Sequence, residues 1–122
     1  MFSLEPLNRF AIEIIPKQMF WEWAKSVENK LQWPQLEEED KGPNNIYIIP
    51  PSYFGQYLDD CLEKNFEVFF QNELNMFVTD ADLWPSNRTY EMFQNWFEVK
   101  ISDMVWGLEE YVNPEFEFWN PN

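Results

Sequence analysis

Alternating side chains near the start of the chain predict a half-buried β-strand. Residues 7–15 read LNRFAIEII, and every second position from Phe10 onward is strongly apolar. A period of two places these positions on one face of an extended chain. The side chains expected to face the core are Phe10, Ile12 and Ile14.

The period then changes from that of a strand to that of a helix. Pro16 suits the first turn of a helix, where its missing N–H has no intrahelical bond to lose. Apolar residues recur beyond it at spacings of three and four, so we expect an amphipathic helix that follows the strand directly and ends before Pro34. Its apolar stripe is Phe20, Trp23, Ala24, Val27 and Leu31.

The middle of the chain predicts a loop, a short strand and a long helix. Residues 34–45 combine an acidic run with a Gly-Pro step and paired Asn, which are typical of an exposed loop. The apolar run at 46–49 reads as a buried strand that stops at two prolines. A helix is expected to begin near Ser52 or Tyr53 and to continue to about Met76. Its apolar stripe is Leu58, Cys61, Leu62, Phe66, Phe69, Phe70 and Leu74.

The last third predicts a loop, a short helix and a third strand. Residues 78–87 read as a loop, and Ser86 or Asn87 is expected to cap the following helix. The apolar face of that helix is Tyr90, Phe93, Trp96 and Phe97. A strand is then expected from Val99 to about Trp106, and the acidic and aromatic residues from 107 onward read as an irregular end.

These elements predict an α+β fold in the order β-α-β-α-α-β. We expect a small three-stranded mixed sheet with helices packed on one face. Residues 1–106 would form a single domain, and residues 107–122 a C-terminal tail or arm. A strand-helix-strand connection within one sheet is usually a right-handed crossover, so the first two strands are expected to be parallel and adjacent. The third strand is expected on the other side of the first, in a direction that the pattern leaves open.

Composition adds a strong negative charge to this picture. Among 122 residues there are 22 acids, 8 bases and no histidine, for a net charge of −14. Aromatic residues make up 20% of the chain, so it can bury enough apolar surface to fold despite its charge. The sequence shows neither the pattern of a signal peptide nor an apolar run that could span a bilayer, and a cytoplasmic location is the expectation.

Few residues indicate catalysis or a cofactor. Without histidine the chain lacks the commonest general base and zinc ligand, and it has no glycine-rich phosphate loop, so no cofactor is predicted. Cys61 lies on an apolar stripe and reads as a buried structural thiol. The acids Asp80, Asp82 and Asp103 are candidates for a carboxylate-based enzyme or a divalent-metal site. The alternative for Asp80 and Asp82 is a solvated turn with helix-capping acids.

The charge points instead to protein partners. It would repel a phosphate backbone, so direct binding to nucleic acid is not expected. An acidic surface could bind a basic protein, or mimic nucleic acid and inhibit a basic DNA-binding protein, or simply keep the protein soluble. The aromatic residues that fall outside the core stripes are candidates for an interaction surface. They are Trp21, Trp33, Phe116, Phe118 and Trp119, of which the last three could instead fold back as an edge strand or arm.

One further cluster is suggested by the segment that precedes the short helix. If Trp84, Arg88 and Trp96 lie together, the guanidinium of Arg88 could stack on an indole while pairing with an acid. Such a cluster would be either a structural clasp or a small binding cleft.

Several segments resemble a family of small, acidic bacterial proteins without an assigned function. The similar segments are PKQMFWEWAKS at 16–26, NIYIIP at 45–50 and DLWPSNRTYEMFQNWFEVKISDMV at 82–105. The resemblance covers most of residues 7–106, is most specific between the WP and WF pairs, and implies a bacterial, cytoplasmic protein. The chain departs from the family pattern at Met19, where the relatives have proline, and in its tail.

Three hypotheses about function follow from these observations. The first is a noncatalytic interaction or regulatory protein whose acidic surface meets a basic partner. The second is a carboxylate-based enzyme or divalent-metal-binding protein. The third is a nucleic-acid mimic.

Overall fold

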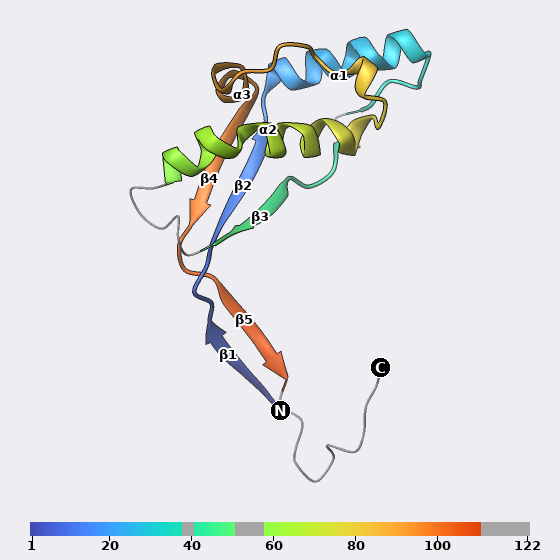
Figure 1. The fold of residues 1–122 in the computed structure, drawn as a ribbon. Coiled ribbons are helices and arrows are strands. Elements are labelled where there is room, and N and C mark those ends of the chain that lie inside the picture. Colours follow the sequence, from blue (N-terminus) through green and yellow to red (C-terminus); the bar gives the residue numbers. More distant parts are fainter. Residues whose placement is uncertain (38–40, 51–57, 111–122) are drawn as a thin grey trace.

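The protein has an α+β fold with a three-stranded sheet, a separate two-stranded ribbon and helices packed against the sheet (Figure 1). This computed structural model describes residues 1–37, 41–50 and 58–110. The strands are β1 (Phe2–Pro6), β2 (Phe10–Pro16), β3 (Asn45–Ile49), β4 (Phe97–Ser102) and β5 (Trp106–Glu110). The α-helices are α1 (Gln18–Leu31), α2 (Leu58–Phe77) and α3 (Tyr90–Trp96), and a 3-10 turn lies at Ala81–Leu83.

The main sheet has the strand order β3-β2-β4, and both neighbours of β2 are antiparallel to it. The third predicted strand therefore lies on the expected side of the first. The expected parallel pairing of the first two strands, and with it the mixed sheet, is wrong. At about 1.5 Å per residue the 14 residues of α1 span about 21 Å, and this helix runs across the end of the sheet instead of back along its strands (Figure 1). Asn45 consequently begins β3 opposite Ile14, at the end where β2 finishes.

The core lies between the helices and the face of β2 that the alternating pattern predicts. Phe10, Ile12 and Ile14 are fully buried, which confirms their expected orientation. The helix α2 crosses this face of the sheet (Figure 1), and Phe70 at its middle is fully buried. The predicted stripe of α2 is buried or half-buried throughout. On β3, Ile46 alternates with the inward-facing residues and is exposed, so this strand is buried on one face only.

The two ends of α1 differ in how well the sequence predicts them. Pro16 ends β2 instead of starting the helix, and Lys17 is the N-cap residue, with its N–H donating to the carbonyl oxygen of Trp96 (2.8 Å). At the other end Gln32 adopts a left-handed conformation with φ of 58°. The N–H of Trp33 then donates to the carbonyl oxygen of Glu28 (2.9 Å), which closes the helix before Pro34 as predicted.

The other two helices also show small differences from the prediction. The helix α2 ends at Phe77, one residue beyond the predicted end, and its predicted start near Ser52 or Tyr53 lies outside the described residues. The N-cap of α3 is Thr89, whose Oγ1 accepts from the N–H of Met92 (3.1 Å), and not Ser86 or Asn87. Asn87 instead occupies a turn with φ of 55°.

The ribbon formed by β1 and β5 was not predicted. The expected third strand is two strands, because β4 ends at Ser102 and β5 begins at Trp106. Residues 107–110, expected to begin an irregular tail, pair antiparallel with β1. Pro6 is opposite Trp106 and Ala11 is opposite Ser102. Between these two pairs, the segment that joins β1 to β2 therefore has one residue more than the segment that joins β4 to β5. Such an extra residue bends a strand pair, and the ribbon extends away from the helices (Figure 1).

Candidate functional site

Arg88 ties the loop before α3 to the middle of α2. Its Nε donates to Glu67 Oε1 (2.6 Å), its Nη1 donates to the carbonyl oxygen of Pro85 (2.8 Å), and its guanidinium carbon lies 5.7 Å from the centre of the Trp84 ring. The indole N–H of Trp84 donates to the carbonyl oxygen of Val78 (2.8 Å). Both side chains of this clasp thus donate to partners on the protein itself, and the arrangement holds a loop in place.

Trp96 belongs to the buried core and not to the clasp. Only 6% of it is exposed, and its ring lies 5.5 Å from Phe70 and 6.1 Å from Trp23, centre to centre. The indole of Trp23 in turn donates to the carbonyl oxygen of Leu83 (3.1 Å), which fastens the 3-10 turn to α1. Of the three residues grouped by the sequence, Trp84 and Arg88 therefore make the contact with each other, and Glu67 is the acid that completes it.

The candidate metal ligands have structural positions in the loops. Asp80 caps the 3-10 turn, because its Oδ1 accepts from the N–H of Asp82 (3.0 Å). Asp103 lies between β4 and β5. Within the described part of the chain, no three Cys, Asp or Glu side chains come together in a way that could hold a metal ion.

Cys61 is buried on α2, where Asn65 donates to its carbonyl oxygen (2.9 Å). Burial raises the pKa of this thiol above its ordinary value, which disfavours the reactive thiolate. The position is therefore that of a structural thiol.

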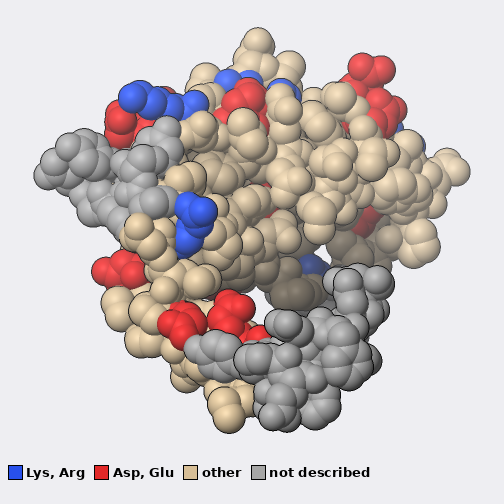
Figure 2. Space-filling model, turned by 60° about the horizontal axis from the view of Figure 1, so that its bottom comes forward, with Lys and Arg blue, Asp and Glu red and all other residues tan. Residues whose placement is uncertain are grey.

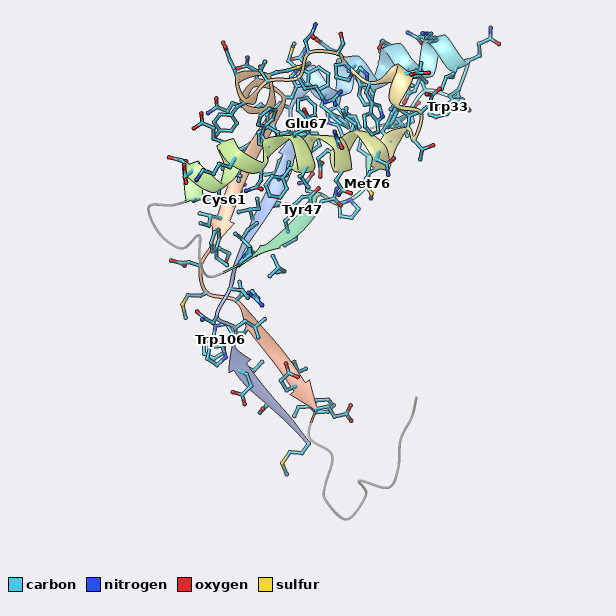
Figure 3. The ribbon with its side chains drawn as sticks, in the orientation of Figure 1. Trp33, Tyr47, Cys61, Glu67, Met76 and Trp106 are labelled. Carbon is cyan, nitrogen blue, oxygen red and sulfur yellow. The ribbon has the colours of Figure 1, made fainter. Side chains whose placement is uncertain are left out.

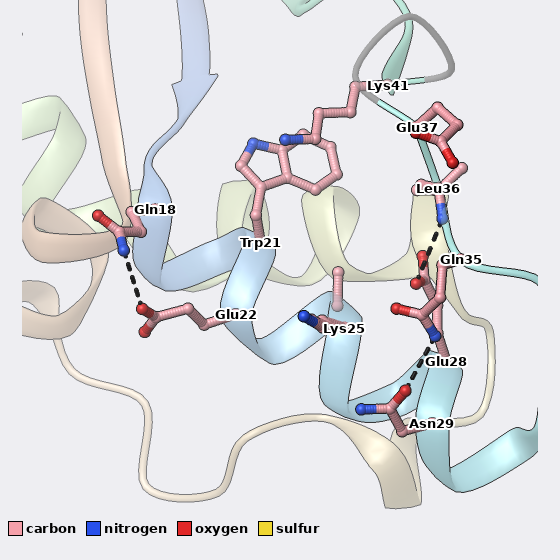
Figure 4. Close-up of a pocket in the computed structure, with 11 residues that line it drawn as sticks. Gln18, Trp21, Glu22, Lys25, Glu28, Asn29, Gln35, Leu36, Glu37 and Lys41 are labelled. Carbon is pink, nitrogen blue, oxygen red and sulfur yellow. Dashed lines mark hydrogen bonds between the residues drawn. The ribbon is translucent and has the colours of Figure 1, made fainter.

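Trp21, one of the candidate interaction residues, borders a hollow beside α1 (Figure 4). The hollow measures about 660 Å³, and the ammonium of Lys41 lies 4.7 Å from the centre of the Trp21 ring. Another residue of this hollow, buried Glu28, accepts from the N–H of Leu36 (3.4 Å), which secures the chain beyond α1.

The other candidate aromatic residues are separate from this hollow. Trp33 is partly exposed at the end of α1 (Figure 3), and its ring centre lies 6.0 Å from that of Phe77. The remaining candidates, Phe116, Phe118 and Trp119, lie outside the described residues.

The ribbon presents an apolar face that the sequence pattern did not reveal. Residues paired directly across an antiparallel ribbon share a face. The pairing of Leu4 with Leu108 and of Pro6 with Trp106 therefore gathers these side chains on one side, together with Phe2. All five side chains are exposed, and Trp106 stands well apart from the helices (Figure 3). The apolar ribbon face is defined by Phe2, Leu4, Pro6, Trp106 and Leu108.

The ribbon also carries carboxylates: Glu110 lies opposite Phe2 on the apolar ribbon face, whereas Glu5 and Glu109 lie opposite Gly107 and Ser3 on the other face. Glu5, Glu109 and Glu110 belong to the two strands, whose sequences FSLEP and WGLEE contain no base. Figure 2 brings the lower end of the molecule forward and shows acidic side chains there among uncharged surface. An isolated two-stranded ribbon is only marginally stable, and large exposed apolar patches on a protein indicate binding sites.

A second residue that the sequence did not single out is Glu73, a buried acid on α2. Its Oε2 accepts from the amide of Asn45 (2.7 Å) and from the hydroxyl of Tyr47 (2.5 Å). Burial raises the pKa of Glu73, and the two hydrogen bonds act in the opposite direction. The pKa of Tyr47 is also raised, first by burial and then by the bond to Glu73. An acid in a helix reads as solvent-exposed from sequence, so only the position of β3 beneath α2 could reveal this pair.

Comparisons with known proteins add no family to these observations. Neither protein-family models, nor curated proteins, nor solved structures gave a match to the chain. In the part of the chain that the structure describes, no helix is long and apolar enough to cross a membrane.

Proposed function

We propose that this protein is a noncatalytic interaction protein that binds a basic partner protein through its apolar ribbon face. The observation that carries the proposal is the exposure of Phe2, Leu4, Trp106 and Leu108, each more than half exposed, on a ribbon that extends away from the core. Burying each of these half-exposed side chains against a partner would contribute about 1 kcal/mol. A partner surface that covers the whole face would also stabilise the two-stranded ribbon itself.

Charge decides what kind of partner fits this surface. Glu5, Glu109 and Glu110 lie on the same ribbon, and the whole chain carries a net charge of −14. A second copy of the protein would bring two strongly negative surfaces together, and the repulsion would oppose association. A partner with an apolar centre and lysine or arginine around it would instead be attracted to the ribbon over a distance set by the ionic strength.

The test is capture of proteins by the immobilised full chain, with Leu4→Ser/Leu108→Ser as the disrupted variant and Val68→Ser as the matched control. Val68 is an exposed apolar residue on α2, far from the ribbon in the chain, so its substitution removes similar apolar surface without touching the ribbon. Circular dichroism and thermal unfolding should show that all three proteins keep the folded core.

The expected result is a basic protein that the wild type and Val68→Ser retain and the double variant loses. Purified partner should then bind more weakly as NaCl rises from about 50 mM to about 500 mM, since screening weakens contacts between opposite charges. Equal retention by the wild type and the double variant would refute the role of the ribbon. Dimerisation of the wild type in sedimentation experiments, lost in the double variant, would show that a second copy is the partner instead.

Nucleic-acid mimicry is tested in the same system. If the captured protein binds DNA, a mimic should be displaced from it by duplex DNA, and an ordinary partner that uses another surface should stay bound. Displacement would assign the third hypothesis to this protein.

A further inference from the structure

A groove separate from the ribbon lies where α1, α2 and the start of β3 meet. It measures about 440 Å³, and its apolar lining comes from both helices and from the segment between α1 and β3. They include Phe20 and Trp21 of α1, Met76 and Phe77 of α2, and Leu36 and Pro43 of the intervening segment. A space of this size and lining suits a small organic molecule.

Glu73 is the polar group that distinguishes this groove from an ordinary surface depression. It is only 4% exposed, and it is nevertheless one of the residues that line the groove. The hydroxyl of Tyr47 accepts from the amide of Asn72 (2.9 Å), so its own hydrogen is free to point to Glu73. The bonds from Tyr47 and Asn45 both end on Oε2, and Oε1 accepts no hydrogen bond from the described residues.

The second carboxylate oxygen of Glu73 indicates the chemistry of a ligand. Among the described residues no buried side-chain oxygen lacks a hydrogen-bond partner, so Oε1, which has no protein donor, stays open to solvent at the groove that Glu73 lines. A charged N–H group is the donor that a carboxylate oxygen binds most strongly. The surrounding aromatic rings can receive both an apolar body and a positive charge. We propose that this groove binds a small organic cation, in which a primary ammonium group donates to Glu73 Oε1 and an apolar body lies between Trp21 and Met76.

Two further observations support this assignment. Burial raises the pKa of Glu73, so the ionised form gains most from a cation that enters the groove. The ammonium of Lys41 already lies over the Trp21 ring at 4.7 Å, which shows that this indole accepts a cation. Lys41 also lines the groove. Its ammonium repels a cationic ligand there, whereas the carboxyl of Glu73 attracts that ligand.

Binding of benzylammonium to the full chain tests the proposal, with benzyl alcohol and benzoate as neutral and anionic probes of similar shape. Calorimetry gives the affinity, and amide chemical shifts give the location. We expect saturable shifts around residues 42–45 and 73–77, and a much weaker effect of the two other probes. Benzyl alcohol that binds as tightly as benzylammonium, or an absence of saturable shifts in these segments, would overturn the proposal.

Glu73→Gln is the decisive variant, because it removes the charge and keeps the shape of the side chain. It should lower the affinity for benzylammonium by about tenfold or more. Glu63→Gln removes the same charge from an exposed position of α2 and should leave the affinity nearly unchanged. Equal losses in the two variants would show that only the overall negative charge matters, and unchanged affinity in Glu73→Gln would overturn the site.

A second variant keeps the test decisive if Glu73→Gln does not fold. Lys41→Met lies outside the sheet and the three α-helices, preserves the aliphatic stem of the side chain and removes the competing positive charge. It should raise the affinity for benzylammonium severalfold, since a like charge beside the ligand is lost. An affinity that falls or stays the same would place the cation elsewhere and refute the proposal.

Discussion

Removing the guanidinium of Arg88 should destabilise the protein far more than breaking an ordinary surface ion pair. In Arg88→Ala the loop before α3 loses the ion pair to Glu67, the bond to the Pro85 carbonyl and the contact with the Trp84 ring. The Arg88 side chain is 18% exposed and that of Glu67 is 41% exposed, so the ion pair is partly screened by solvent. Bonds to charged groups contribute about 1.5–3 kcal/mol when shielded, and a cation over an indole about 0.5–1 kcal/mol. After allowance for screening, we expect a loss of about 2–3 kcal/mol in the free energy of unfolding.

The same helix supplies a matched control. Lys64 pairs with Asp60 one turn earlier on α2 (3.0 Å), and their side chains are 65% and 51% exposed. Such exposed pairs contribute about 0.3–0.5 kcal/mol, so Lys64→Ala should have a small effect in the same urea titration.

A double-mutant cycle tests the origin of the effect. The double variant should lose about 1 kcal/mol less stability than the sum of the losses of Arg88→Ala and Glu67→Gln, because both substitutions remove the same contact. A loss below about 0.5 kcal/mol in Arg88→Ala would refute the structural clasp, since it would equal that of an exposed pair. If Arg88→Ala were as stable as the wild type, the structural clasp would be excluded, and a small binding cleft would be the alternative that remains for this cluster.

Three other perturbations test the core and its buried polar groups. Burial raises the pKa of Glu73 above its ordinary 4.5, so the folded protein binds this proton more tightly than the unfolded chain does. The wild type should therefore lose stability relative to Glu73→Gln as the pH rises through the raised pKa. Denaturant titrations between about pH 4 and about pH 8 measure this loss. A difference in the free energy of unfolding that stays constant over this range would contradict the burial of the charge. Cys61 should react with a thiol reagent slowly in the native protein and at once in denaturant, because the thiol is buried and its pKa is raised; fast native labelling would show that α2 opens readily. Phe70→Ala should cost about 3–5 kcal/mol, because the side chain is fully buried against Phe93 and Phe97. Unfolding by urea measures this loss, and a cost below about 1 kcal/mol would show that the ring is poorly packed.

The periods of two and of three to four determined most of the local structure. They placed Phe10, Ile12 and Ile14 on the core face of a strand and located most of the apolar stripes of the helices, because burial of apolar surface selects these repeats. The exceptions are Leu31, which is exposed, and Phe97, which begins β4 instead of ending a helix. The lack of histidine is likewise a property of the sequence alone, because it depends on residue types and not on their arrangement. It removes the commonest general base and metal ligand from the chemistry that the chain can use. Local rules were weaker at element ends, where Pro16 ended β2 instead of starting α1, and Thr89 took the cap position expected for Ser86 or Asn87.

Only the tertiary structure decided how these elements meet. The direction of β3 depends on α1 crossing the end of the sheet, and a strand pattern carries no information about the path of the helix before it. The acid at position 73 became a groove residue because β3 places Asn45 and Tyr47 beneath it, some 28 and 26 positions away in the chain. The ribbon required β1 and β5 to pair across nearly the whole sequence. Both candidate sites therefore depend on pairings between segments that are far apart in the chain. Backbone hydrogen bonds would allow many such pairings, and the packing of the whole fold selects the ones that form.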